Sequence, residues 1–163
     1  MITAVRVDER LIHGQVAMTW TKTLNLDGLV VASDEAAEND IQKMTLKMAA
    51  PADVRTIIKS VDGAIQLLQN PRSQEMRLMV LVPTVKDAVR VAKAFPNQIE
   101  FMNVGNAGKM TPPSPDKKLL TKEVMLTPDE ITALGELIEL YPETVFQATP
   151  VMEKRLAKDV LAN

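Results

Sequence analysis

Short apolar runs rich in β-branched residues alternate with stretches of helical periodicity, and this alternation limits the possible folds more than any other feature. The runs are apolar at nearly every position, which is typical of strands that are buried on both faces. Five such strands are predicted, at Ile2–Val7, Gly28–Ala32, Val54–Ile58, Arg77–Val82 and Ile99–Val104. Because helical stretches connect them, the predicted fold class is α/β: a doubly wound, mainly parallel open sheet with helices on both faces.

The connecting helices are predicted from apolar residues that recur every three or four positions. In the second helix, Ile41, Met44, Thr45 and Met48 share one face, and Pro51 ends the helix. The predicted ranges are Gln15–Leu24, Glu35–Ala50, Val61–Gln69 and Thr84–Phe95.

The pattern changes after Val104. Three prolines and two glycines in Gly105–Asp116 predict a loop. Thr127-Pro128-Asp129-Glu130 is a capping box with proline at the first helical position, which predicts the start of another helix. The remaining predicted elements are a strand within Lys118–Leu126, a strand at Thr144–Ala148 and a helical tail from Val151, all in one domain of residues 1–163.

The composition argues against several classes of function. The chain has no cysteine, which excludes disulfides, thiolate metal sites and cysteine nucleophiles. With one histidine, a zinc site is not expected, and no cofactor is implied. A net charge of −2 gives no basic surface for nucleic acid. No apolar run approaches the roughly 20 residues that span a bilayer, and no secretory leader pattern occurs, so a cytoplasmic location is expected.

The candidate site is the segment Arg6–Val16, RVDERLIHGQV, which contains the only histidine, His13. Ligands of open α/β sheets bind beyond the carboxyl ends of the strands, and the first such loop is Asp8–His13. His13 is therefore expected at a helix N-terminus, where free amides and the helix dipole favour anions. A phosphoryl group on His13 could accept hydrogen bonds from the amides of Gly14 and Gln15, and Gly14 would allow close approach.

Three side chains near His13 are candidates for supporting roles. Arg10 offers a guanidinium fork that matches phosphate geometry, and Arg6 is a second candidate for the same task. Asp8 or a backbone carbonyl could hold the second imidazole nitrogen. Each residue also has a structural interpretation: Arg10 and Asp8 as a surface ion pair, Arg6 at a helix C-terminus, Gly14 as a turn and His13 as a cap.

At this point the sequence resembles a known family. The segment Val5–Val16, VRVDERLIHGQV, is similar to the active-site segment of the mannose/fructose/sorbose-type enzyme IIB of the bacterial phosphoenolpyruvate-dependent sugar phosphotransferase system. The resemblance extends over about Met1–Pro150. Further similar segments are Trp20-Thr21, Ser33-Asp34-Glu35, Ala49-Ala50-Pro51, Asn103-Val104-Gly105-Asn106 and Thr121-Lys122-Glu123-Val124.

The resemblance implies a phosphotransferase that acts through a phosphohistidine. His13 would receive a phosphoryl group from the phosphohistidine of a IIA protein and pass it to a sugar bound by the membrane IIC/IID complex during uptake. It implies that Arg10 contacts the phosphoryl group and that Asp34 and Asn106 support the site. It also implies peripheral association with the inner face of the membrane through IIC/IID. A homo-oligomer is left open.

Three other classes of protein share parts of this pattern. A histidine-type phosphatase or mutase has an arginine directly before the histidine and a second histidine, whereas Ile12 precedes His13 here. A receiver-like signalling domain would need an aspartate after the third strand, where Lys59-Ser60 stands. A non-enzymatic anion- or nucleotide-binding regulatory module with the same loop remains the alternative.

Overall fold

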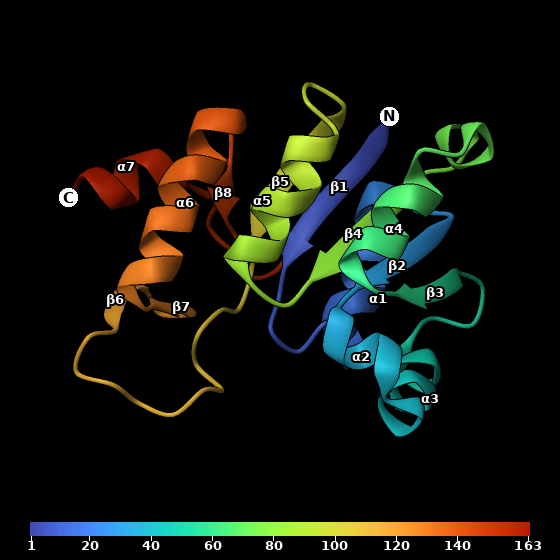
Figure 1. Cartoon of the computed structure of the whole chain (residues 1–163), viewed down its shortest axis with the longest axis horizontal. Helices are drawn as coiled ribbons and strands as arrows, with labels where there is room; N and C mark the ends of the chain where they lie inside the picture. The colour runs from blue at the N-terminus through green and yellow to red at the C-terminus, as the bar shows by residue number, and fades with distance from the viewer.

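A twisted seven-stranded sheet forms the centre of the computed structural model, which describes all residues 1–163 (Figure 1). The strand order is β3-β2-β4-β1-β5-β8-β9, in which only β9 runs antiparallel to its neighbour. The predicted α/β class is confirmed. The strands are β1 Ile2–Val7, β2 Gly28–Ala32, β3 Arg55–Lys59, β4 Leu78–Val82, β5 Ile99–Val104, β8 Val145–Phe146 and β9 Arg155–Leu156.

Helices cover both faces of this sheet. The α-helices are α1 Gly14–Leu24, α2 Asp34–Glu38, α3 Asp40–Ala49, α4 Val61–Leu68, α5 Val85–Ala94, α6 Pro128–Leu140 and α7 Ala157–Ala162, with a 3₁₀ helix at Pro71–Glu75. In Figure 1, α4, α5 and α6 lie on the near face, whereas α1 lies behind the sheet. None of the helices combines the length and apolarity that crossing a membrane requires.

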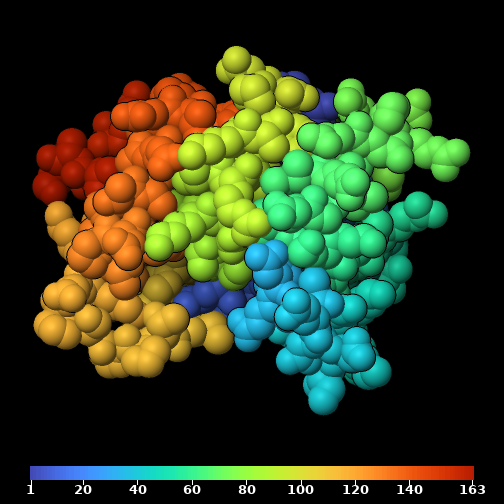
Figure 2. All heavy atoms as spheres, viewed as in Figure 1, coloured from blue at the N-terminus to red at the C-terminus, as the bar shows by residue number.

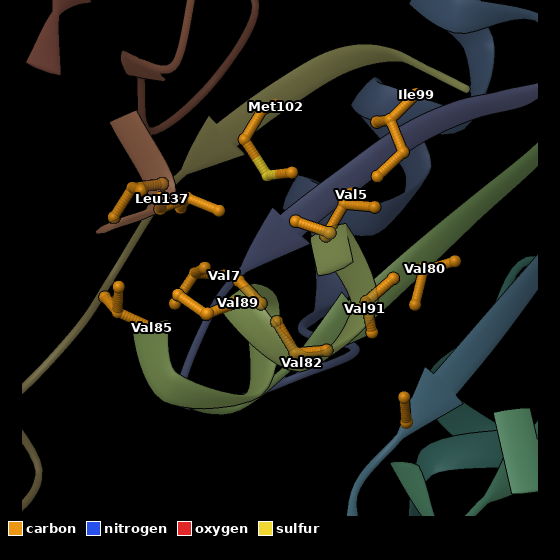
Figure 3. Close-up of a cluster of buried hydrophobic side chains, with 14 of the residues drawn as sticks. Val5, Val7, Val80, Val82, Val85, Val89, Val91, Ile99, Met102 and Leu137 are labelled. Atoms are coloured by element: carbon orange, nitrogen blue, oxygen red, sulfur yellow. The ribbon is translucent and has the colours of Figure 1, made fainter. Parts of the chain in front are cut away.

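Two hydrophobic layers follow from the alternation of side chains along the strands. On one face, Val5 and Val7 of β1 pack with Val80 and Val82 of β4 and with the inward side of α5, as Figure 3 shows. On the other face, Ala4 of β1 belongs to a second cluster, to which α1 contributes. The central strands are therefore buried on both sides, and this explains why their sequences are apolar throughout.

The helix predicted at Glu35–Ala50 is two helices, and its apolar face was assigned wrongly. Asn39 interrupts it, because its side chain accepts a hydrogen bond from the Gln42 N–H at 2.9 Å and so caps a new helix, α3. The new helix packs through Leu46. Ile41, Met44 and Met48 consequently point to solvent, with exposed fractions of 80, 65 and 79%.

The capping box at Thr127 is only half formed in the way the sequence predicts. Thr127 accepts from the Glu130 N–H at 3.3 Å and α6 begins as expected. The Glu130 carboxylate, however, does not return to Thr127. It accepts from the amides of Val85 and Lys86 at 2.9 and 3.1 Å, and so caps α5 instead.

The carboxyl-terminal third also differs in detail from the prediction. The strand expected within Lys118–Leu126 is a hairpin of β6 Lys118–Thr121 and β7 Val124–Leu126. The last predicted strand is shortened to β8, because its later residues turn toward Arg6. The tail becomes helical only at Ala157, after β9 has paired with β8.

The predicted loop Gly105–Asp116 is tied to the hairpin at its start. Ala107 donates to the Glu123 carbonyl at 3.1 Å and accepts from the Met125 N–H at 2.9 Å. The next residue, Gly108, has a φ of +78° and lies so close to the Met125 carbonyl that a Cβ would be 1.6 Å from its oxygen. Only glycine fits this position.

We therefore expect Gly108→Ala to lower the free energy of unfolding by about 1–3 kcal/mol, because the methyl group adds both left-handed strain and a clash with β7. Gly135 is the matched control, since it lies within α6 and an added methyl group there would meet open space. Gly135→Ala should raise stability by up to about 1 kcal/mol through helix propensity. Urea denaturation of both variants tests the pair, and equal stabilities would contradict the described packing.

Candidate active site

The Asp8–His13 loop lies where the direction of winding of the sheet changes. β1 and β4 are neighbours, yet the chain leaves β1 toward α1 on one face and β4 toward α5 on the other. The loop starts from this crevice, since the Asp8 N–H donates to the Val82 carbonyl of β4 at 2.9 Å. Open α/β sheets bind ligands at such a crevice, as the sequence prediction assumed.

The Asp8–His13 loop has one side that packs against the core and another that faces solvent. Leu11 donates its N–H to the Asp8 carbonyl at 2.9 Å and has a φ of +60°, an uncommon conformation for a branched residue. This turn places the side chains of Leu11 and Ile12 in the core beneath α1. His13 then lies on the outside, exposed to solvent.

His13 is the N-cap residue of α1, and this helix start is open. The His13 side chain makes no capping hydrogen bond, the first turn has no acidic residue, and the amides of Gly14 and Gln15 have no acceptor in the chain. Gly14 has a φ of +40° and nothing within 4 Å of a potential Cβ. Among the five helices with eight or more residues, α1 alone lacks a side-chain cap. The dipole and free amides there can receive an anion.

Arg10, the expected phosphate ligand, lies beside the imidazole. Its Nη1 lies 3.2 Å from His13 Nε2. Asp8 fixes this arginine, because its Oδ1 accepts from the Arg10 N–H at 3.0 Å and lies 3.8 Å from Nε. Of the two terminal guanidinium nitrogens only Nη1 makes a contact, to His13, so Nη2 keeps unused donors. His13 thus lies between free helix amides that follow it in the chain and a guanidinium that contacts its ring.

Arg6 does not join this group, contrary to its assignment as a phosphate ligand. It is 1% exposed and donates to Asp8 Oδ2 at 3.0 Å and to the side chain of Asn103. Its guanidinium also stacks on Trp20 at 5.4 Å and donates to the carbonyls of Gln147 and Ala148 at 3.1 and 2.9 Å. Burial lowers the pKa of Arg6 from its ordinary value, and the Asp8 carboxylate opposes this shift.

The three expected supporting residues have structural partners. Asp8 binds Arg6 and Arg10 rather than the imidazole. Asn106 donates to Asp8 Oδ2 at 3.4 Å and so lies next to the Asp8–His13 loop. Asp34 instead caps α4 by accepting from the Val61 N–H at 2.9 Å, with Arg90 at 3.3 Å. The Val61 hydrogen bond and then Arg90 hold the pKa of the Asp34 carboxyl below its ordinary value.

Two residues with clear roles at this edge were not assigned from the sequence. Asn103 accepts from Arg6 and donates to the Gln147 carbonyl at 3.0 Å, which joins β1 to β5 and β8. Glu9 binds two amides of the segment after β5. Both contacts join residues about a hundred positions apart, and no local spacing signals them. No group of three or more His, Asp or Glu side chains is placed to bind a metal ion.

Known proteins share both this sequence and this fold. Residues 2–153 match the family described as PTS system sorbose subfamily IIB component. A probable phosphotransferase enzyme IIB component of Streptococcus pyogenes serotype M6 is 47% identical, with 90% of each chain covered. The mannose-specific EIIAB component of Escherichia coli K12 is 36% identical over 64% of this chain and 32% of its own.

The solved structures agree with the sequence relatives. The IIBSor domain of the sorbose permease from Klebsiella pneumoniae superposes with a TM-score of 0.88, at 28% identity and with 99% of this chain and 96% of that chain covered. The family match spans nearly the whole chain, including the histidine loop and the strands that position it. The chain therefore belongs to the sorbose subfamily of IIB components of the sugar phosphotransferase system.

Proposed function

We propose that His13 accepts a phosphoryl group from the phosphohistidine of a IIA protein and passes it to a sugar bound by a IIC/IID membrane complex. PTS IIB components are phosphotransferases that work with IIA and IIC/IID proteins. The observation that carries the proposal is the position of His13 at the uncapped start of α1, with Arg10 Nη1 3.2 Å from its ring.

The first transfer exchanges one phosphorus–nitrogen bond for another. The bond to the donor imidazole breaks while the bond to His13 forms, with the two nitrogens in line, and negative charge spreads over the three equatorial oxygens. The amides of Gly14 and Gln15 and the Arg10 fork stabilise this charge, each preorganised donor being worth roughly 3 kcal/mol. No general base is needed, because the imidazole lone pair is the nucleophile.

In the second transfer the phosphorus–nitrogen bond to His13 breaks while a phosphorus–oxygen bond to a sugar hydroxyl forms. The hydroxyl loses its proton and the departing imidazole takes up one, so His13 returns to its neutral form. The exposure of His13 supports this use, since a donor and an acceptor must reach the same ring in turn. The E. coli mannose-specific relative carries IIA and IIB on one chain, which supports a IIA donor. We propose that residues 1–163 act as one IIB domain that reaches the membrane through IIC/IID.

The alternative is a regulatory module that binds an anion reversibly at the same amides. Mass spectrometry of the intact protein after incubation with phosphorylated IIA separates the two, because only transfer adds a covalent phosphoryl group. The stability of the product identifies the bond. A phosphohistidine survives base, whereas an acyl phosphate on Asp8 or Glu9 does not.

His13→Ala should abolish covalent phosphate uptake, since no other imidazole exists in the chain. Its fold should be unchanged, because the side chain is exposed and makes no capping hydrogen bond. Radiolabel transfer from phosphorylated IIA measures the loss. Met18→Ala, on the exposed side of the same helix, is the control and should label normally. A labelled His13→Ala protein would disprove the assignment.

Arg10→Lys should slow the transfer about tenfold or more, because lysine keeps the charge but loses the planar fork that matches phosphate. The matched control is Arg77→Lys. Arg77 donates to the Leu24 carbonyl at 2.9 Å and binds the opposite end of α1, so its loss affects the same helix without touching the site. Rapid-quench measurement of the labelling rate compares them. Equal rates in both variants would show that Arg10 has no special role.

A further inference from the structure

Glu9 joins the His13 loop to the segment that follows β5. Its two carboxylate oxygens accept hydrogen bonds from the consecutive amides of Lys109 and Met110, at 2.9 and 3.0 Å. Its own N–H donates to the Asn106 carbonyl at 2.9 Å. Three hydrogen bonds from one residue thus connect two loops that are about a hundred positions apart.

The segment that Glu9 holds has a defined shape of its own. Lys117 Nζ donates to the Gly108 and Thr111 carbonyls at 2.9 and 3.2 Å, which closes residues 108–117 into a ring. Ala107, which directly precedes it, pairs with Val124 of β7 through backbone hydrogen bonds. Glu9 is therefore the residue of the His13 loop that binds residues 109–110 of this preformed segment.

Glu9 takes no part in the groups that would bind the phosphoryl group. It has no hydrogen bond to His13 or Arg10, and Asp8 alone fixes Arg10. A carboxylate near a phosphate site repels the incoming anion. Its presence here is explained by its two acceptor oxygens, one for each amide, whereas a glutamine of the same size has only one acceptor oxygen.

The segment presents exposed side chains next to the loop that carries His13. Met110 is 67% exposed, and Lys109 is also exposed with no ion-pair partner. In Figure 2 a dark-blue patch from the early part of the chain lies between the gold segment after β5 and the light-blue α2 and α3. Exposed methionine is typical of surfaces that bind other proteins.

A protein donor needs more surface than His13 offers. A specific protein complex buries roughly 800 Å² on each partner, so a donor whose imidazole meets His13 must also cover the adjacent loops. We propose that Glu9 is a positioning residue that holds the Lys109–Met110 segment in the docking surface for phosphorylated IIA. This inference rests on the proposed function and adds a residue that governs recognition of the donor rather than the chemistry at His13.

The test compares two phosphodonors. Phosphorylated IIA must dock, whereas phosphoramidate needs only His13: its phosphorus–nitrogen bond breaks, a bond to the imidazole forms and ammonia leaves. Glu9→Gln keeps the size of the side chain and loses one acceptor. It should raise the KM for phosphorylated IIA about tenfold, as expected for one charge-assisted hydrogen bond, with little change in kcat. Its rate with phosphoramidate should equal that of the unaltered protein.

Glu130→Gln is the matched control, because Glu130 also accepts two consecutive amides, from Val85 and Lys86 at the start of α5. It should lower stability to a similar degree and leave the KM for IIA unchanged. Met110→Ser should raise that KM without lowering stability. Since Glu9 is proposed to act through Met110, the double variant should show less than the sum of the two effects.

An unchanged KM in Glu9→Gln, or an equal loss of rate with phosphoramidate, would overturn the role of Glu9 while leaving the phosphotransferase function in place. Failure of the unaltered protein to accept phosphate from IIA would overturn the proposed function and this inference with it.

Discussion

The buried contact between Arg6 and Asp8 is the interaction on which the active edge depends. Removing one partner of a buried ion pair typically costs about 3–5 kcal/mol, because the other charge remains without compensation. Here the guanidinium is also bonded to Asn103 and two backbone carbonyls, so few of its donors are left over. Asp8 is thereby held at the end of β1, and its second oxygen fixes the Arg10 amide. The buried Arg6 therefore determines, through Asp8, where the more exposed Arg10 lies.

The same loop divides its residues between two tasks. Arg6, Asp8, Leu11 and Ile12 are buried and determine where the backbone runs. Arg10 and His13 lie outside that framework and remain accessible. Preorganised donors stabilise charge only if they need not move when the charge develops. The buried half of the loop supplies this rigidity, which would explain why so much of the loop around His13 faces the core.

The sequence was sufficient to predict features that depend on local residue patterns. It was not sufficient where a residue's contacts come from distant parts of the chain. Strands, most helices and the location of His13 at a helix start follow from periodicity and from the α/β winding rule. Arg6 was misassigned because its partners, Asn103 and the carbonyls of Gln147 and Ala148, come from β5 and from the residues after β8. The face of α3 was misassigned because the apolar spacing of Ile41, Met44 and Met48 does not reveal the break at Asn39.

The long helices differ in whether a side chain caps their N-terminus, and this difference links the fold to the proposed chemistry. The other long helices use Asn39, Ser60, Thr84 and Thr127 as caps, and α5 has the Glu130 carboxylate in addition. These caps consume the free amides that would otherwise attract an anion. A cap on α1 would stabilise that helix by about 1 kcal/mol, but it would occupy the amides that we propose bind the phosphoryl group. The open start of α1 is thus a local loss of stability that leaves an anion-binding position free.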